Sequence, residues 1–382
     1  MKTKRFINAA LCLSAVLLIL NPSTAKAGAG LSGSPLNIGA GIDMFMGIPV
    51  NDRHFSGRYD TEFELRAIEL NIGAPVDPFF DALVTISYHE EEIELEEGWV
   101  SATLPLNLKL QVGREFIPFG YLNRIHEHDF PQADQPYVIE GLTTDHGFIG
   151  DGGHIEIMAP FFNPTLSLIL GAYQNIGHSV GRRIKGTPVL ARLQSYAQSP
   201  SGKHEFLYGA SYLTSFGERN RLEGRNSDRR ALGHSNQVAG LDFKYKFSPG
   251  GQTYRGLTVG AEYLYVDYEP NQAHNIYNPD SAAYVQDFDP GTDQGFYLFT
   301  HWNFNRFWGA GYRFDYTDVL FGSQVENEKL TAHSVYGEWR ATEFSRIRLQ
   351  YQHLIDPRED APENLLMLQG TFFIGWHPPH RF

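Results

Sequence analysis

The stretch Arg346-Ile347-Arg348-Leu349-Gln350-Tyr351-Gln352 decides the fold of this chain. Apolar residues occupy every second position, and the positions between them carry charged or amide side chains. Successive side chains of a β-strand point to opposite faces, so the stretch predicts a strand with water on one face and apolar matter on the other. The stretch Leu241-Asp242-Phe243-Lys244-Tyr245-Lys246-Phe247 repeats the pattern. The apolar face then belongs either to the core of a soluble sandwich or to the lipid-facing wall of a barrel.

About sixteen stretches of the chain alternate in this way, and we expect each of them to form a strand. The expected strands are 36–47, 59–72, 80–89, 92–103, 106–115, 152–159, 165–175, 187–197, 204–216, 235–248, 254–268, 292–302, 306–317, 328–341, 345–356 and 363–375.

The connections between these stretches separate the two alternatives. From the fourth strand on, short and long connections take turns. The short ones are 104–105, 160–164, 198–203, 249–253, 303–305 and 342–344. The long ones are 116–151, 176–186, 217–234, 269–291 and 318–327, and 357–362 is intermediate. Short periplasmic turns and long extracellular loops are typical of outer-membrane barrels, whereas a Greek-key sandwich has no reason to keep this order. The sequence therefore predicts an all-β, transmembrane, antiparallel up-and-down β-barrel of about sixteen strands.

The first 27 residues have the pattern of a secretory signal peptide. Lys2, Lys4 and Arg5 precede the apolar run 9–20, and Ala25-Lys26-Ala27 is a small-x-small cleavage site. A membrane-anchor helix is the alternative, but the run is shorter than the roughly 20 residues that a span needs. Residues 28–382 then form the barrel. We expect export to the outer membrane of a Gram-negative bacterium.

Composition excludes several functions. The only cysteine, Cys12, lies in the predicted signal, so residues 28–382 hold no disulfide and no thiolate site. The net charge of the whole chain is −13; without Lys2, Lys4, Arg5 and Lys26, 27 basic residues remain against 44 acidic ones, which gives −17. We therefore expect no binding of nucleic acid. Neither Gly-x-Ser-x-Gly nor His-Glu-x-x-His occurs, and we expect no enzyme activity.

A barrel of about sixteen strands is wide enough for an aqueous channel. We expect charged residues of both signs on a wet inner wall, and the acidic balance favours cations. The expected wall residues include Lys244, Lys246, Arg313, Asp315, Arg346 and Arg348. The acidic run 90–97 is interpreted as a solvated rim.

The long connection 116–150 contains apolar residues and the sequence Pro118-Phe119-Gly120-Tyr121, which a solvated loop does not need. A long loop with apolar content packs against something, and in a wide barrel the available space is the lumen. We predict that loop 116–150 folds inward and forms the constriction of the pore. The residues expected there are Arg114, His126, His128, Asp129, Asp134, Asp145 and His146.

Two histidine pairs are candidate metal sites. His126 and His128 point the same way in an extended segment, and Asp129 or Glu127 could add an oxygen ligand for zinc or a similar ion. The alternative is a polar loop with two solvated imidazoles. His377 and His380 follow the last strand, and they form either a second ligand pair or a turn that tucks in the end of the chain.

Three stretches resemble one family of Gram-negative outer-membrane barrels, described as zinc-regulated, TonB-dependent outer-membrane receptors. They are Gly113-Arg114 through Gly120-Tyr121-Leu122-Asn123 followed by His126-x-His128, Glu343 through Tyr351, and Gly375-x-His377-x-x-His380-Arg381-Phe382. The resemblance implies a porin-like barrel linked to zinc supply. It leaves the transported solute open.

The expected function is a porin-like channel that passes small polar solutes or ions passively and is linked to the supply of zinc or another metal. The alternative is a receptor, or a sheath that houses an electron-transfer partner. The expected partners are outer-membrane lipid, further copies in a homo-trimer, and the barrel-assembly machinery, which would recognise the last strand and the terminal Phe382.

Overall fold

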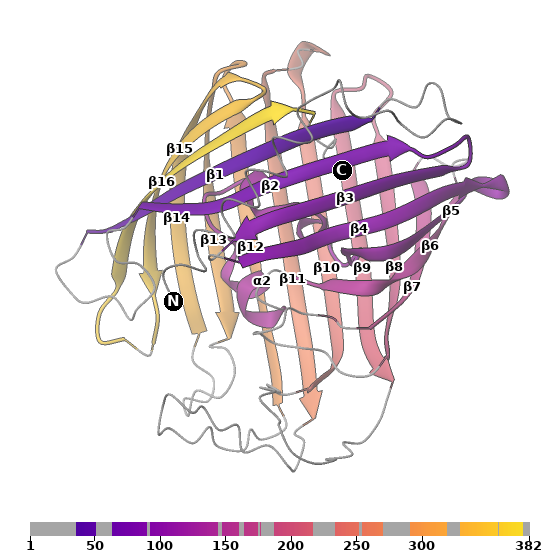
Figure 1. Cartoon of the computed structure of the whole chain (residues 1–382). Coiled ribbons are helices and arrows are strands. Elements are labelled where there is room, and N and C mark those ends of the chain that lie inside the picture. The colour runs from indigo at the N-terminus through magenta and orange to yellow at the C-terminus, as the bar shows by residue number, and fades with distance from the viewer. Residues whose placement is uncertain are drawn as a thin grey trace, which may run out of the picture.

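The computed structural model forms a closed barrel of sixteen antiparallel strands (Figure 1). It describes residues 36–50, 63–89, 92–143, 147–159, 164–174, 176, 187–216, 234–251, 254–269, 291–318, 329–357 and 359–376. The predicted signal peptide 1–27, Asp145, His146, His377, His380 and Phe382 lie outside the described residues.

Consecutive strands pair around the ring, and β1 closes it by pairing with β16. The predicted up-and-down barrel is therefore confirmed, with most expected strand ends within three residues of those observed. The strands are β1 (Asn37–Pro49), β2 (Phe63–Pro75), β3 (Phe80–His89), β4 (Glu92–Leu104), β5 (Leu108–Phe116), β6 (Ile149–Ala159), β7 (Thr165–Gln174), β8 (Thr187–Gln198), β9 (His204–Phe216), β10 (His234–Phe247), β11 (Gly256–Glu269), β12 (Gly291–Asn303), β13 (Trp308–Asp318), β14 (Lys329–Thr342), β15 (Ser345–Ile355) and β16 (Glu363–Gly375).

On β15 the outward face is apolar and the inward face is polar. On β15, Leu349 and Tyr351 are 51% and 39% exposed, whereas Arg348 and Gln350 between them are 1% and 0% exposed. Strand side chains alternate between the two faces, so polar residues line the inside of this wall and apolar residues cover its outside. This arrangement is the reverse of a soluble protein.

The connection from β5 to β6 crosses the inside of the barrel. It contains the 3-10 turns η2 (Leu122–Arg124) and η3 (Glu127–Asp129) and the helix α2 (Tyr137–Leu142). Helix α2 contacts β11, β12 and β13 (Figure 1). Further contacts reach Arg66 on β2 and Arg348 on β15. Residues 117–148 are called the inner segment below.

The inner segment builds an apolar core within the ring of strands. Ile117, Phe119 and Leu122 of the segment are buried in one cluster with inward-facing residues of β7 to β12, among them Tyr173 and Phe299. On this side of the lumen the charged residues Arg192, Asp242 and Glu262 lie among apolar residues that pack against the segment. Buried polar side chains lie on β1 to β5 and also on β12 to β16, among them Asp315 and Gln350.

Two further 3-10 turns, η1 (Pro105–Asn107) and η4 (Pro249–Gly251), occur in short connections between strands. Among the described residues, no helix has the length and apolar character needed to cross a bilayer.

Candidate functional site

Two cavities lie between the inner segment and the strands that include β1 to β4. The larger, about 370 Å³, is lined by Asn71, Ser101 and Lys109 near the ends of strands that carry the short connections. The smaller, about 50 Å³, is lined by residues closer to the opposite end, among them Ser87 and His89. Both cavities are also lined by Glu69, Phe116, Ile125 and His128, which therefore lie between them.

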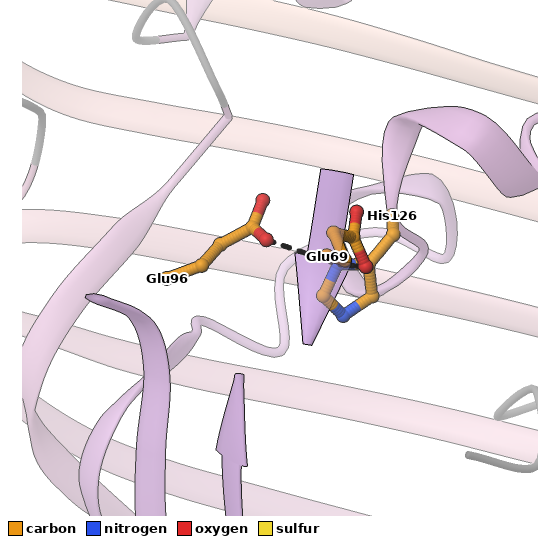
Figure 2. A group of neighbouring side chains, drawn as sticks. All are labelled: Glu69, Glu96 and His126. Atoms are coloured by element: carbon orange, nitrogen blue, oxygen red, sulfur yellow. Dashed lines mark ion pairs between the residues drawn. The ribbon is translucent and has the colours of Figure 1, made fainter. Parts of the chain in front are cut away.

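A cluster of carboxylates and imidazoles occupies this boundary. Nδ1 of His126 lies 3.5 Å from Oε2 of Glu69 and 3.4 Å from Oε2 of Glu96 (Figure 2). Nε2 of the same ring lies 3.1 Å from Oε2 of Glu97. Glu69 comes from β2, Glu96 and Glu97 come from β4, and His126 precedes η3 of the inner segment. The cluster thus joins the segment to the wall.

β-Bulges explain how the wall presents these carboxylates. The register between β3 and β4 skips Glu96, so Glu96 and Glu97 both reach His126 although they are consecutive. The register between β1 and β2 skips Arg66, and the inward face of β2 moves from Arg66 to Glu69. Bulges of this kind redirect side chains and are frequent near functional sites. The sequence pattern missed Glu69 for this reason.

The acidic run was interpreted as a solvated rim, and for two of its residues that interpretation is wrong. Glu97 is 7% exposed and Glu96 is half-buried, and both face His126 inside the barrel. The alternating pattern would put only one of two consecutive residues on the inner face. The signal that could have revealed them is the unbroken acidic pair itself, since a strand interior places such a pair together only at a bulge.

His128 completes the cluster. Its Nδ1 lies 2.7 Å from Oε1 of Glu69, and its Nε2 lies 3.1 Å from Oδ2 of Asp129. Its ring stacks on that of His126, with centroids 5.6 Å apart. Both nitrogens of His128 already face carboxylates, so His128 and Asp129 orient the cluster. Among the described residues, the ligand atoms that lie close enough together to hold a metal ion with His126 belong to Glu69 and Glu96, and not to His128 or Asp129 as the sequence predicted.

The carboxylates set the charge of the two rings. Burial acts to lower the pKa of His128, but Glu69 and Asp129 outweigh it and raise this pKa to about 10. Burial likewise acts to lower the pKa of His126, but Glu69 and Glu96 hold it well above its ordinary value. The rings therefore carry positive charge at neutral pH and partly balance the surrounding carboxylates.

The inner segment is anchored to β11 through Glu262. The Leu122 amide donates to Oε1 of Glu262 at 2.8 Å, and the Tyr297 hydroxyl donates to the same oxygen at 2.9 Å. Gly120 makes this approach possible. It has a φ of +62°, and a Cβ there would lie 2.1 Å from Oε2 of Glu262. The position requires glycine both for its backbone conformation and for space.

Asp134 anchors the far part of the segment. Its Oδ2 accepts from Arg313 on β13 at 2.8 Å, and Gln350 and Gln352 of β15 donate to its two oxygens. Burial acts to raise the pKa of Asp134, but the Arg313 guanidinium lowers it below its usual value. A buried carboxylate with one cation and two amide donors is a satisfied anchor.

Four of the remaining predicted residues, Asp315, Arg346, Arg348 and Lys244, contact the inner segment. Asp315, Arg346 and Arg348 face the inner segment: Asp315 accepts from the Tyr137 amide, Arg346 donates to the His128 carbonyl and Arg348 donates to the Phe130 carbonyl. Lys244 lies over the Tyr121 ring, and Lys246 is half-buried at the end of β10.

Arg114 is not brought to the cluster. It pairs with Asp151 of the neighbouring strand at 3.1 Å. It lines neither of the two cavities. Its assignment to the constriction is therefore wrong.

Comparison with known proteins gives one related sequence. A protein of Aquifex aeolicus (strain VF5), described as uncharacterized, is 30% identical over 345 residues, which cover 84% of this chain and 70% of the relative. The chain belongs to the same family as this Aquifex aeolicus protein. No protein-family model matches the chain.

Solved outer-membrane barrels share the fold of this chain. OmpF of Salmonella typhi, in a complex with daunomycin, has a TM-score of 0.59 at 9% identity and covers 90% of this chain and 98% of its own. The outer membrane channel DcaP of Acinetobacter baumannii has a TM-score of 0.53 at 10% identity, with 90% and 99% covered. A trimer form of OmpT, an outer membrane protein of Vibrio cholerae, has a TM-score of 0.52 at 9% identity, with 90% and 100% covered.

These comparisons support the outer-membrane barrel fold that the sequence resemblance implies. They lend no support to the description as a zinc-regulated receptor.

Proposed function

We propose that this chain is a porin-like channel in the outer membrane of a Gram-negative bacterium, exported by residues 1–27, and that it passes small polar solutes or ions passively. The apolar outward face suits lipid, and the polar inward face suits water. The single observation that carries the proposal is the pair of cavities, which lie in line along the inner face of the strands and meet at the cluster.

The constriction of the proposed channel is the gap between the inner segment and the wall. Glu69 and Phe116 on the wall, with Ile125 and His128 on the segment, line both cavities, so a solute that moves from one to the other passes them. On the other side, the apolar core of the segment packs against β7 to β12. The route therefore follows strands β1 to β5. Asp145 and His146 stay predictions for the same constriction.

Charge at the constriction favours cations. Four carboxylates, those of Glu69, Glu96, Glu97 and Asp129, face two imidazoles in the cluster. Even with both rings protonated, the carboxylates are in excess. Charged side chains at a narrow point set the ion preference of a pore.

Two other functions were open from the sequence. A sheath for an electron-transfer partner needs a wide lumen, and the packed core of the inner segment takes that space. A receptor needs a ligand that the loops hold. A link to the supply of zinc or another metal is a further part of our proposal. We expect homo-trimers, as in the trimer form of OmpT, and recognition of β16 and Phe382 by the assembly machinery.

Conductance in a planar bilayer tests the proposal. The folded barrel, identified by its heat-modifiable band, is inserted under a salt gradient. We expect discrete current steps and a reversal potential that shows a preference for cations. A folded barrel without steps would contradict the channel and favour the receptor. An anion preference would contradict the role assigned to the carboxylates.

A further inference from the structure

We infer that Glu69, Glu96 and His126 bind one divalent transition-metal ion, and that this ion ties the inner segment to the barrel wall. The site differs from the predicted one, because two of its three ligands come from strands. Figure 2 shows the three side chains converging from separate parts of the fold.

The ligand atoms have the spacing that such an ion requires. One oxygen from each glutamate and one nitrogen of His126 all lie within 4.8 Å of one another. Ligands about 2 Å from a tetrahedral zinc lie about 3.3 Å apart. The distances from Nδ1 of His126 to the two carboxylate oxygens are 3.4 and 3.5 Å. A small movement of the side chains would complete the coordination.

The same three atoms lack hydrogen bonds. Among the described residues, Oε2 of Glu69, Oε2 of Glu96 and Nδ1 of His126 are buried atoms without a hydrogen-bond partner. The Glu69 side chain is 5% exposed, so its free oxygen is enclosed. The three atoms face one another only in long ion pairs of His126 with the two carboxylates, at 3.5 and 3.4 Å. Buried polar atoms are usually hydrogen-bonded, so three that lack a hydrogen bond and face one point indicate a ligand there. A dication would satisfy all three at once.

Neighbouring groups orient the proposed ligands. Glu97 lies 3.1 Å from Nε2 of His126, which leaves Nδ1 of that ring directed at the site. His128 lies 2.7 Å from Oε1 of Glu69, which leaves Oε2 free. A carboxylate behind a histidine ligand is the usual support of a zinc site. The cluster therefore has both a set of ligands and the groups that position them.

The ligand types identify the class of ion. One imidazole nitrogen and two carboxylate oxygens suit zinc and its neighbours among the divalent transition metals, whereas calcium and magnesium prefer oxygen ligands alone. Three protein ligands leave a position for water. Zinc is therefore the probe of choice.

Bound metal would act on the proposed channel, and this consequence rests on the proposed function. The site lies at the boundary of the two cavities. An ion there bridges β2 and β4 to the inner segment, occupies the gap and adds positive charge. We expect micromolar zinc to lower the conductance and to weaken the preference for cations.

Zinc titration of the metal-stripped, folded barrel by calorimetry at fixed pH tests the site directly. We expect about one equivalent of zinc, and at least a tenfold loss of affinity in Glu69→Gln, Glu96→Gln and His126→Gln, since even a supporting partner of a zinc ligand is worth roughly tenfold. Glu92→Gln is the matched control, because Glu92 belongs to the same acidic run but is exposed. It should bind zinc like the wild type.

Folding and adventitious binding are controlled separately. Glu96→Gln is the safest variant, because Oε2 of Glu96 has no hydrogen bond to lose within the described structure. The heat-modifiable band shows that each variant folds. His377→Ala with His380→Ala should leave the affinity unchanged. No zinc binding to the wild type would overturn the inference, as would unchanged binding in Glu96→Gln and His126→Gln or binding that disappears with the two terminal histidines.

The two proposals fail in different ways. Zinc binding without current steps would support the metal site and contradict the channel. Current steps without zinc binding would support the channel and overturn the metal site.

Discussion

Asn123 is hydrogen-bonded to both backbone groups of Phe148. The Phe148 amide donates to Oδ1 of Asn123 at 2.6 Å, and Nδ2 of Asn123 donates to the Phe148 carbonyl at 3.0 Å. Nδ2 also donates to the Ile117 carbonyl at 2.8 Å. Ile117 and Phe148 are the two ends of the inner segment. The buried Asn123 side chain therefore holds the two ends of the inner segment together.

Replacing Asn123 by alanine should loosen the segment while the ring of strands persists. The change removes three hydrogen bonds and leaves the buried Phe148 amide without a partner, whereas the Phe148 and Ile117 carbonyls still accept from the Ile117 and Phe119 amides. We expect a loss of about 2 kcal/mol in the stability of the contact between the two ends of the segment. Protease cleavage within 117–148 and current noise should both increase. Asn305→Ala is the matched control, because Asn305 accepts from the Phe307 and Trp308 amides in an exposed turn. Equal protease sensitivity of the two variants would contradict this role.

Gly120→Ala should disturb the anchor on β11. The new methyl group would meet the Glu262 carboxylate at 2.1 Å, so Glu262 must release the Leu122 amide. Gly250→Ala is a close control, because Gly250 has a similar φ of +67° but nothing lies within 4 Å of its Cβ position. Both variants lose about 1 to 2 kcal/mol to backbone strain. Only Gly120→Ala should change the single-channel conductance; if Gly250→Ala changes it equally, the Glu262 anchor is not the cause.

Lowering the pH should weaken the ion pair between Asp134 and Arg313 only below about pH 4. Arg313 lowers the pKa of Asp134 in the folded protein, so the stabilisation is complete above the unfolded value near 4 and is lost as the pH falls through the lowered pKa. Asp134→Asn should destabilise the segment by about 2 kcal/mol at neutral pH. The difference from the wild type should be constant between pH 5 and 8 and should shrink at lower pH.

Thermal unfolding of the two proteins across this range measures the difference. Asp151→Asn is the control, since it breaks the Arg114–Asp151 pair away from the inner segment. A wild-type advantage that falls already between pH 6 and 5 would contradict the lowered pKa of Asp134.

Most of the fold was predicted from the alternation of apolar and polar residues along the strands. Stretches such as 346–352 have one apolar and one polar face, and this pattern together with the connection lengths predicted a closed barrel with sixteen strands in the observed order. Only a closed sheet pairs all backbone groups while it exposes an apolar face to lipid. The physical rule is strict, so the prediction was reliable.

The candidate site was predicted only in part. His126 was found because two histidines stand close together in an unusual loop. Glu69, Glu96 and Glu97 were missed because bulges change which residues face inward, and a bulge depends on pairing between strands that a single stretch does not reveal. Arg114 was misplaced for a related reason, since its partner Asp151 is brought to it only by the pairing of β5 with β6.

The most direct test of the proposed route is cysteine block in a planar bilayer. Ser101 lines the larger cavity, whereas Ser201 lies in an exposed turn between β8 and β9 and lines neither cavity. A cationic, thiol-reactive reagent is added to open channels of Ser101→Cys and Ser201→Cys, and mass spectrometry confirms labelling. We predict a stepwise fall of the current in Ser101→Cys and none in Ser201→Cys or the wild type. An unchanged current through labelled Ser101→Cys would contradict a pathway between the inner segment and strands β1 to β5.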